Sequence, residues 1–239
     1  MIHFRPASPA RSARRSLPLN VEETIQHLRS RGLTYCGRPG KLETLARLVR
    51  DVEARAVPGV FLEAGVAMGG SAMVTAKAKS PQRQLRLYDV FTMLPPPSEG
   101  DDARSHEVYR TFVEGNVSGV VDRNYVQHAE DLLAYTRENM RAVGIDPDAE
   151  GVVFVKGLYE DTLRVEEPVA FAHIDCDWYE SVRLCIERLR DPMSPGGVML
   201  FDDYNSFPGC KRAVDEWLSA DKRFAVIHSD WTVAVQRTA

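Results

Sequence analysis

The stretch FAHIDCDWYESV places Asp175 and Asp177 directly after an apolar run that is typical of a buried strand. A second acidic pair, Asp202 and Asp203, follows the next strand-like run, VMLF. Burying a carboxylate costs several kcal/mol unless an opposite charge or hydrogen bonds compensate for it. The acids are therefore either exposed to solvent where the strands end or part of a functional site.

A metal site explains this arrangement if the two runs are neighbouring parallel strands, which lie about 4.8 Å apart. Asp175, Asp202 and Asp203 would then crowd one corner, where like charges do not all stay ionised without a partner. An all-oxygen ligand set with no nearby Cys or His pair selects a hard divalent cation, Mg²⁺ first, with Mn²⁺ or Ca²⁺ as alternatives. In the competing interpretation, Asp202 and Asp203 cap a helix and Asp175 is partly protonated.

The turn EAGVAMGGSA, over 63–72, follows another strand-like run. Glycine permits a tight turn and lets the backbone approach a ligand closely. The spacing differs from the GxGxxG of a pyrophosphate-binding loop, and an acid at this position would repel a diphosphate. S-adenosylmethionine carries a sulfonium and an ammonium, so the turn favours this cofactor over NAD, unless it binds nothing. The predicted cofactor-binding residues of the turn are Glu63, Gly65, Val66, Gly69, Gly70 and Ser71.

Two further acids follow strand-like runs. Asp89 ends LRLYD, where an acid can accept hydrogen bonds from both ribose hydroxyls of a nucleoside cofactor. It can equally cap a helix or face solvent in a turn. Asp161 lies in KGLYEDTL, where an adenine would bind, and can accept a hydrogen bond from the adenine amine. With Thr162 it can instead cap a short helix.

Alternating helical and strand periodicity positions all of these residues. Predicted helices cover 21–32, 41–56, 71–80, segments around 106–118 and 129–143, 179–191 (with MSPGG as its stop signal) and 211–220. Predicted strands cover 60–66, 85–90, 152–156, 169–175, 198–203, 224–229 and 232–236. The alternation predicts a doubly wound α/β fold with a mostly parallel seven-stranded sheet and a C-terminal antiparallel hairpin. Ligands bind at the carboxyl ends of such strands, where the acids lie.

Composition sets limits on partners and location. The chain of 239 residues has a net charge of -4, which argues against nucleic-acid binding. Its four scattered cysteines indicate a reducing cytoplasm and no disulfide framework. No stretch approaches the roughly 18 apolar residues of a membrane helix. Residues 1–20 are rich in Arg and Ser and free of acids, which is typical of a transit peptide. We expect instead a flexible basic tail or an arm that orders on a partner.

Five ordered blocks lie between residues 33 and 231: EAGVAMGGSA, LYDVFTMLPPP, KGLYEDTL, IDCDWYESV and SPGGVMLFDDYNSFPGCKRAVDEW. Together they resemble the macrocin O-methyltransferase family, the metal-dependent sugar O-methyltransferases of natural-product biosynthesis. The resemblance implies a Rossmann-like class I methyltransferase fold, S-adenosylmethionine as methyl donor, Mg²⁺ as activator and a glycosylated acceptor such as an antibiotic. It also implies a homodimer or higher homo-oligomer.

By motif, Asp175 matches the base and metal ligand of the family, and Asp202 and Asp203 match its other two ligands. Glu63, Gly65 and Asp89 match its cofactor-binding blocks. The sequence departs from the family pattern at Tyr35-Cys36-Gly37, at 90–95 and at Val182.

The predicted organisation is a basic arm over 1–20 and one methyltransferase domain over 21–239, with N-terminal helices over 21–56 and a lid insertion over 92–125. In the hypothesis for the reaction, the metal holds a vicinal diol, Asp175 takes the proton and the methyl group is transferred in line. The roles of Asp177 and of the lid residue His106 stay open. Alternatives are a catechol or other non-sugar diol as acceptor, a nicotinamide-dependent oxidoreductase, and a non-catalytic binding module.

Overall fold

The computed structural model describes residues 18–238; residues 1–17 and 239, and so most of the predicted basic arm, lie outside this part. Its strands are β1 (Val60–Ala64), β2 (Leu85–Asp89), β3 (Val152–Lys156), β4 (Val169–Ile174), β5 (Met193–Phe201), β6 (Phe224–Ser229) and β7 (Val233–Arg237). They form a seven-stranded sheet in the order β3-β2-β1-β4-β5-β7-β6. Neighbouring strands are parallel in the pairs β3-β2, β2-β1, β1-β4 and β4-β5, whereas β7 is antiparallel to β5 and to β6. The predicted doubly wound sheet with a closing antiparallel hairpin is confirmed.

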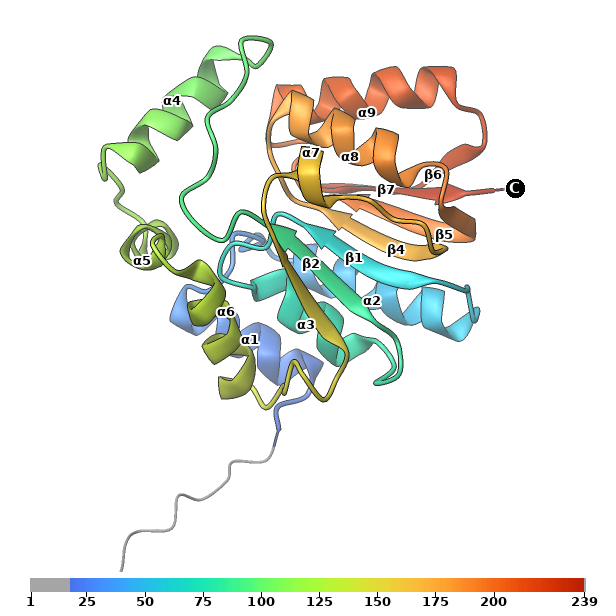
Figure 1. Ribbon diagram of the computed structural model, residues 1–239, viewed down its shortest axis with the longest axis horizontal. Helices are drawn as coiled ribbons and strands as arrows, with labels where there is room; N and C mark the ends of the chain where they lie inside the picture. The colour runs from blue at the N-terminus through green and yellow to red at the C-terminus, as the bar shows by residue number, and fades with distance from the viewer. Residues whose placement is uncertain (1–17, 239) are drawn as a thin grey trace, which may run out of the picture.

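Helices cover both faces of the sheet (Figure 1). They are α1 (Val21–Arg31), α2 (Lys41–Ala54), α3 (Gly70–Ala78), α4 (Ala103–Val113), α5 (Val120–His128), α6 (Leu132–Ala142), α7 (Tyr159–Thr162), α8 (Tyr179–Leu189) and α9 (Pro208–Ala220). Apolar side chains of α1, α2, α3 and α6 form the core on one face, and those of α8 and α9 form the core on the other. None of the helices within residues 18–238 has the length and apolar character that a membrane span requires.

The central strand β4 is buried along its whole length, because sheet neighbours flank it and helices cover both of its faces. Its sequence, VAFAHI, is a continuous apolar run except for His173, as expected of a parallel strand inside an α/β sheet. The amphipathic helix α2 buries one stripe of aliphatic residues: Leu42, Leu45, Leu48, Val49 and Val52. Strand β4 places the polar residue His173 in the interior of the protein, and helix α2 does the same for Lys41.

The stretch MSPGG differs from its prediction. Helix α8 ends at Leu189, but Met193 to Gly197 form the first half of β5 and not a loop that stops the helix. The register between β4 and β5 shifts in this region, since Val169 pairs with Met193 and Phe171 with Val198. Such an irregularity tolerates proline and glycine, which a regular strand does not, so local composition alone misplaced the start of the strand.

Between β2 and β3 the structure has three helices, α4, α5 and α6, where two helical segments were predicted. Helices α4 and α5 are separated by a break that includes Gly115, whose φ is +68°. Figure 1 shows α4 and α5 standing away from the sheet, and Ser105 is the buried residue of α4. This geometry leaves α4 little packing to hold it, and its function as a lid stays a prediction.

We expect Gly65→Ala to destabilise the protein strongly. Gly65 has a φ of +88°, and an added Cβ would overlap the backbone carbonyl oxygen of Asp175. Strain and overlap together should lower the free energy of unfolding by at least about 3 kcal/mol, which is a fall in Tm of at least about 6 °C. Gly37→Ala is the matched control, because an added Cβ there meets no atom within 4 Å. Equal unfolding temperatures for the two variants would contradict the close contact between the first turn and Asp175.

Candidate active site

A cavity of about 450 Å³ opens at the carboxyl ends of the parallel strands. Its volume lies in the range of small-molecule sites. It is lined after β1 by Gly65, at β2 by Asp89, after β3 by Gly157, after β4 by Asp175 and after β5 by Asp202. The sequence therefore predicted correctly that these strand ends meet at one place.

The acids that follow β4 and β5 form one cluster in this cavity. Asp175, Asp202 and Asp203 each offer a carboxylate oxygen, and these atoms lie within 4.8 Å of one another. Burial and the neighbouring carboxylates Asp202 and Asp203 hold the pKa of Asp175 well above its usual range. Burial, followed by the charges of Asp203 and Asp175, raises the pKa of Asp177 in the same way. Asp177 is thus a fourth acid of the site, held at a φ of +57°.

The cluster fits a divalent cation. Asp203 Oδ2 is buried and has no hydrogen-bond partner among the described residues, an atom that a cation would satisfy. The three converging ligands are carboxylate oxygens, which hard cations such as Mg²⁺ prefer. The arrangement suits such an ion without any further ligand from the chain, because Mg²⁺ commonly keeps several waters.

Lys41 is the residue that the sequence interpretation missed. Its Nζ donates to Asp202 Oδ2 at 2.5 Å and to the Asp202 carbonyl oxygen at 2.9 Å, and both side chains are buried. Burial works to lower the pKa of Lys41, but Asp202 and Asp175 outweigh it and the pKa is raised. Burial works to raise the pKa of Asp202, but His173 and Lys41 outweigh it and the pKa is lowered. The only local signal for Lys41 was its place as the first residue of a helix, directly after Gly40.

The expectation that no Cys or His pair lies near these acids was wrong. Cys36 Sγ lies 3.6 Å from Asp175 Oδ2, and His173 Nε2 lies 3.8 Å from Asp202 Oδ1. Burial lowers the pKa of His173, but Asp202 and Glu63 more than compensate and raise it well above its usual value. Cys36 and Asp175 are separated by 139 positions in the sequence, so no local pattern could reveal their contact.

The first turn places its predicted cofactor residues in different surroundings. Gly65 lines the main cavity, while Val66, Gly70 and Ser71 line a small neighbouring recess that Asp175 also borders. Gly69 is the N-cap of α3 in the left-handed region, and an added Cβ there would meet the side chain of Thr136. A Cβ on Gly70 would meet the carbonyl oxygen of Leu33. Close packing inside the protein leaves no room for a side chain at Gly69 or Gly70, and their contact with a cofactor stays a prediction.

Glu63 lies behind the cavity wall and does not line it. The side chain is fully buried, its Oε1 accepts a hydrogen bond from Ser71 Oγ at 2.6 Å, and its Oε2 lies 3.7 Å from His173 Nδ1. A direct contact between Glu63 and a cofactor stays a prediction.

Asp89 holds the turn together and also faces the cavity. Its Oδ2 accepts from the amides of Val66 at 2.7 Å and Ala67 at 3.0 Å, and its Oδ1 accepts from Phe91 N at 2.7 Å. A carboxylate has about four acceptor positions, so one remains for a ligand. Burial raises the pKa of Asp89 against the lowering effect of these amide bonds.

Asp161 lies on the exposed side of α7 and outside the cavity. Gly157, Leu158 and Tyr159 form the cavity wall in this region instead. Asp161 lies within α7, whose N-cap is Leu158 without a side-chain cap hydrogen bond, so the alternative that Asp161 caps this helix is wrong. Its contact with adenine stays a prediction.

Aromatic side chains form the wall between the loop before α2 and the insertion. Tyr35, Phe112 and Tyr125 meet edge to face with centroid separations of 5.7–6.3 Å, and all three line the cavity. Trp178 Nε1 donates to the Pro95 carbonyl oxygen at 3.1 Å. His106 is half-buried on α4 and does not line the cavity.

Residues 23–237 match the sequence profile of the family described as macrocin O-methyltransferase (TylF). The chain belongs to this family. Demethyldecarbamoylnovobiocin O-methyltransferase of Streptomyces niveus is 29% identical over an alignment that covers 74% of this chain and 64% of that protein. The 8-demethyl-8-(2,3-dimethoxy-alpha-L-rhamnosyl)-tetracenomycin-C 4'-O-methyltransferase of Streptomyces olivaceus is 31% identical with the same coverage. The chain thus spans less than two thirds of the length of these curated relatives.

Solved structures of O-methyltransferases share the fold of this chain. The structure of the O-methyltransferase NovP has a TM-score of 0.68 and 26% identity, and the match covers 90% of this chain and 88% of that one. CalS11, a calicheamicin methyltransferase, has a TM-score of 0.59 at 19% identity, which shows the fold alone. The class I methyltransferase fold implied by the sequence resemblance is confirmed.

We expect Lys41→Met to destabilise the protein by about 3–5 kcal/mol, because it leaves buried carboxylate charge without its partner. Chemical unfolding at neutral pH without divalent cations measures this loss. The lowered pKa of Asp202 stabilises the fold above the ordinary pKa of an aspartate, and this contribution is lost as the pH falls towards the folded-state pKa. The difference in unfolding free energy between the wild type and Lys41→Met should therefore become smaller at acidic pH.

The matched control is Lys211→Met, which removes a lysine from an exposed pair with Asp215. An exposed pair contributes about 0–1 kcal/mol, so this variant should unfold nearly as the wild type does. The double variant Lys41→Met/Asp202→Asn should recover part of the lost stability. Equal stability of the two lysine variants would contradict a stabilising role for Lys41.

Proposed function

We propose that this protein is a Mg²⁺-dependent O-methyltransferase that uses S-adenosylmethionine to methylate a sugar hydroxyl of a glycosylated natural product. The observation that carries the proposal is a single cavity that joins Gly65 and Asp89 to the carboxylate cluster. Family membership and the sugar-modifying relatives named above support the reaction class. Neither a nicotinamide-dependent oxidoreductase nor a non-catalytic module explains the cavity, the carboxylate cluster and the family membership together.

The donor side of the cavity would hold S-adenosylmethionine. Gly65 and Ala67 would contact it along the first turn, Asp89 would offer its remaining acceptor position to the ribose, and Leu158 and Tyr159 would cover the base. When bound, S-adenosylmethionine supplies a methyl group on a sulfonium, a good leaving group for in-line displacement. The chain contributes position: holding two reacting groups in contact distance provides a large part of such accelerations.

The acceptor side would hold the cation on Asp175, Asp202 and Asp203. When bound, a divalent cation acts as a Lewis acid and lowers the pKa of an acceptor hydroxyl. Lys41 Nζ keeps Asp202 in place by donating to the carboxylate and to the carbonyl oxygen of Asp202. The aromatic wall of Tyr35, Phe112 and Tyr125 faces the same space and suits the apolar part of a glycosylated acceptor.

Asp175 is the proposed base that takes the hydroxyl proton. In the absence of a cation, burial and the neighbouring acids raise its pKa, which makes it a better proton acceptor than an ordinary aspartate. Asp177 is the second candidate, because it has a raised pKa, lines the cavity and is not one of the three converging metal ligands. A carboxylate that shares its charge with a cation is a weaker base than one that does not, so the two roles must be separated by experiment.

The carboxylate cluster fits a catechol or another vicinal diol as well as it fits a sugar. Only activity measured with each class of acceptor distinguishes these possibilities. A homo-oligomeric state and a cytoplasmic location complete the proposal, as the sequence resemblance and the cysteine content suggest.

Calorimetric titration tests the donor and metal sites. We expect the wild type to bind both S-adenosylmethionine and Mg²⁺, and Asp202→Asn/Asp203→Asn to bind S-adenosylmethionine but not Mg²⁺, because only the cation requires these carboxylates. Asp148→Asn, a substitution of an exposed acid, is the control and should bind both. Failure of both proteins to bind S-adenosylmethionine would overturn the proposed function.

Kinetics of two single variants tests the base. With a panel of rhamnosides and catechols as acceptors and S-adenosylhomocysteine release as the readout, Asp175→Asn should reduce turnover by at least about 100-fold. The same variant should lose Mg²⁺ affinity and keep S-adenosylmethionine affinity. If Asp177→Asn instead abolishes turnover while it retains Mg²⁺ binding, the base is Asp177 and Asp175 acts as a ligand only.

A further inference from the structure

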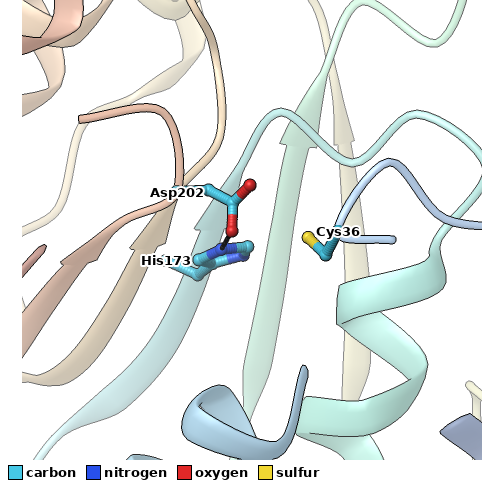
Figure 2. A group of neighbouring side chains, drawn as sticks. All are labelled: Cys36, His173 and Asp202. Carbon is cyan, nitrogen blue, oxygen red and sulfur yellow. Dashed lines mark ion pairs between the residues drawn. The ribbon is translucent and has the colours of Figure 1, made fainter. Parts of the chain in front are cut away.

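The geometry points to a second cation site, selective for a transition metal of the Zn²⁺ class, formed by Cys36, His173 and Asp202. Figure 2 shows these three side chains pointing towards one another from the loop before α2, from β4 and from the end of β5. Each offers one ligand atom, and the three atoms lie within 4.8 Å of one another in the interior of the protein. The site does not depend on the proposed methyl transfer.

The separations suit a tetrahedral ion after a small contraction. Ligands of a tetrahedral Zn²⁺ site lie about 2.0–2.3 Å from the metal, which puts them about 3.3–3.8 Å from each other. His173 Nε2 and Asp202 Oδ1 are already 3.8 Å apart. The other Asp202 oxygen is occupied by Lys41, so Oδ1 is the atom that faces the site.

His173 provides the independent sign of an absent partner. Its side chain is 1% exposed, and neither ring nitrogen has a hydrogen-bond partner among the described residues. Buried polar atoms are nearly always hydrogen-bonded, so two unpartnered nitrogens on one ring call for an explanation. A cation on Nε2 explains one of them.

Glu63 explains the second unpartnered nitrogen of His173, Nδ1. Its Oε2 is also buried without a hydrogen-bond partner and lies 3.7 Å from His173 Nδ1, while Ser71 Oγ holds its Oε1 at 2.6 Å. A histidine that binds a metal usually donates its second N–H to a carboxylate, which orients the ring. Ser71, Glu63 and His173 therefore form a chain that aims Nε2 at Cys36 and Asp202.

The ligand types distinguish this site from the neighbouring carboxylate cluster. Sulfur and imidazole ligands favour Zn²⁺ or Co²⁺, whereas the all-oxygen cluster favours Mg²⁺. The two sites share Asp202, and Cys36 Sγ also lies 3.6 Å from Asp175 Oδ2. Occupation by Zn²⁺ would therefore alter the acids that the proposed reaction uses.

Co²⁺ added to the chelator-treated full-length protein tests the site, because Co²⁺ bound to a thiolate shows a ligand-to-metal charge-transfer band. The wild type should show this band with one equivalent of Co²⁺. Zn²⁺ should abolish it and excess Mg²⁺ should not. X-ray absorption of the Zn²⁺-loaded wild type should show one sulfur ligand. Absence of the band and of the sulfur ligand in the wild type would overturn the proposal without any variant.

Variants assign the ligands. Cys36→Ser should lose the band, whereas Cys185→Ser, the matched substitution of a buried cysteine on α8, should keep it. Glu63→Gln should weaken Zn²⁺ binding by about 10–100-fold, as loss of a histidine-orienting carboxylate does. Asp203→Asn should keep the band while it loses Mg²⁺ binding, so the two sites can fail separately. A band that persists in Cys36→Ser would overturn the assignment, provided that circular dichroism shows a folded variant.

Discussion

The concentration of buried and half-buried carboxyl groups at the ends of β4 and β5 is the constraint on which the rest of the structure depends. The carboxylates involved are Asp175, Asp177, Asp202 and Asp203, with Glu63 immediately behind them. Two buried basic side chains lie among these acids within the described residues: Lys41 binds Asp202, and His173 lies between Glu63 and Asp202. Burial of this many acids is costly without such partners, so the elements that carry them must be held close to the sheet.

This requirement explains the position of the N-terminal helices. Lys41 reaches Asp202 only because α2 packs its aliphatic stripe on the sheet with its first residue at the carboxyl ends of the strands. Cys36 is brought to Asp175 by the same loop. The turn after β1 borders the cavity as well. Asp89 accepts hydrogen bonds from two amides of this turn, and Gly65 leaves room for the Asp175 carbonyl oxygen. The cavity is the space that these contacts leave open.

The proposed cation sites share one residue and differ in chemistry. Asp202 presents Oδ2 to Lys41 and Oδ1 to His173, so its carboxylate connects the oxygen cluster to the sulfur and imidazole ligands. In the proposed reaction the strand-end acids hold the cation, and the loop before α2 and the insertion after β2 line the space that an acceptor would enter.

The sequence by itself determined the sheet, its closing hairpin and the acids at its edge, because apolar periodicity and turn residues are local signals that a strand carries within itself. It also determined that Asp175, Asp202 and Asp203 meet, since the ends of parallel neighbours must coincide. Only the tertiary structure decided the partners of these acids. Lys41 and Asp202 are 161 positions apart, and a lysine at the start of an amphipathic helix looks like an exposed residue. The irregular register at MSPGG and the burial of Glu63 likewise depend on neighbouring strands and helices, which no local pattern specifies.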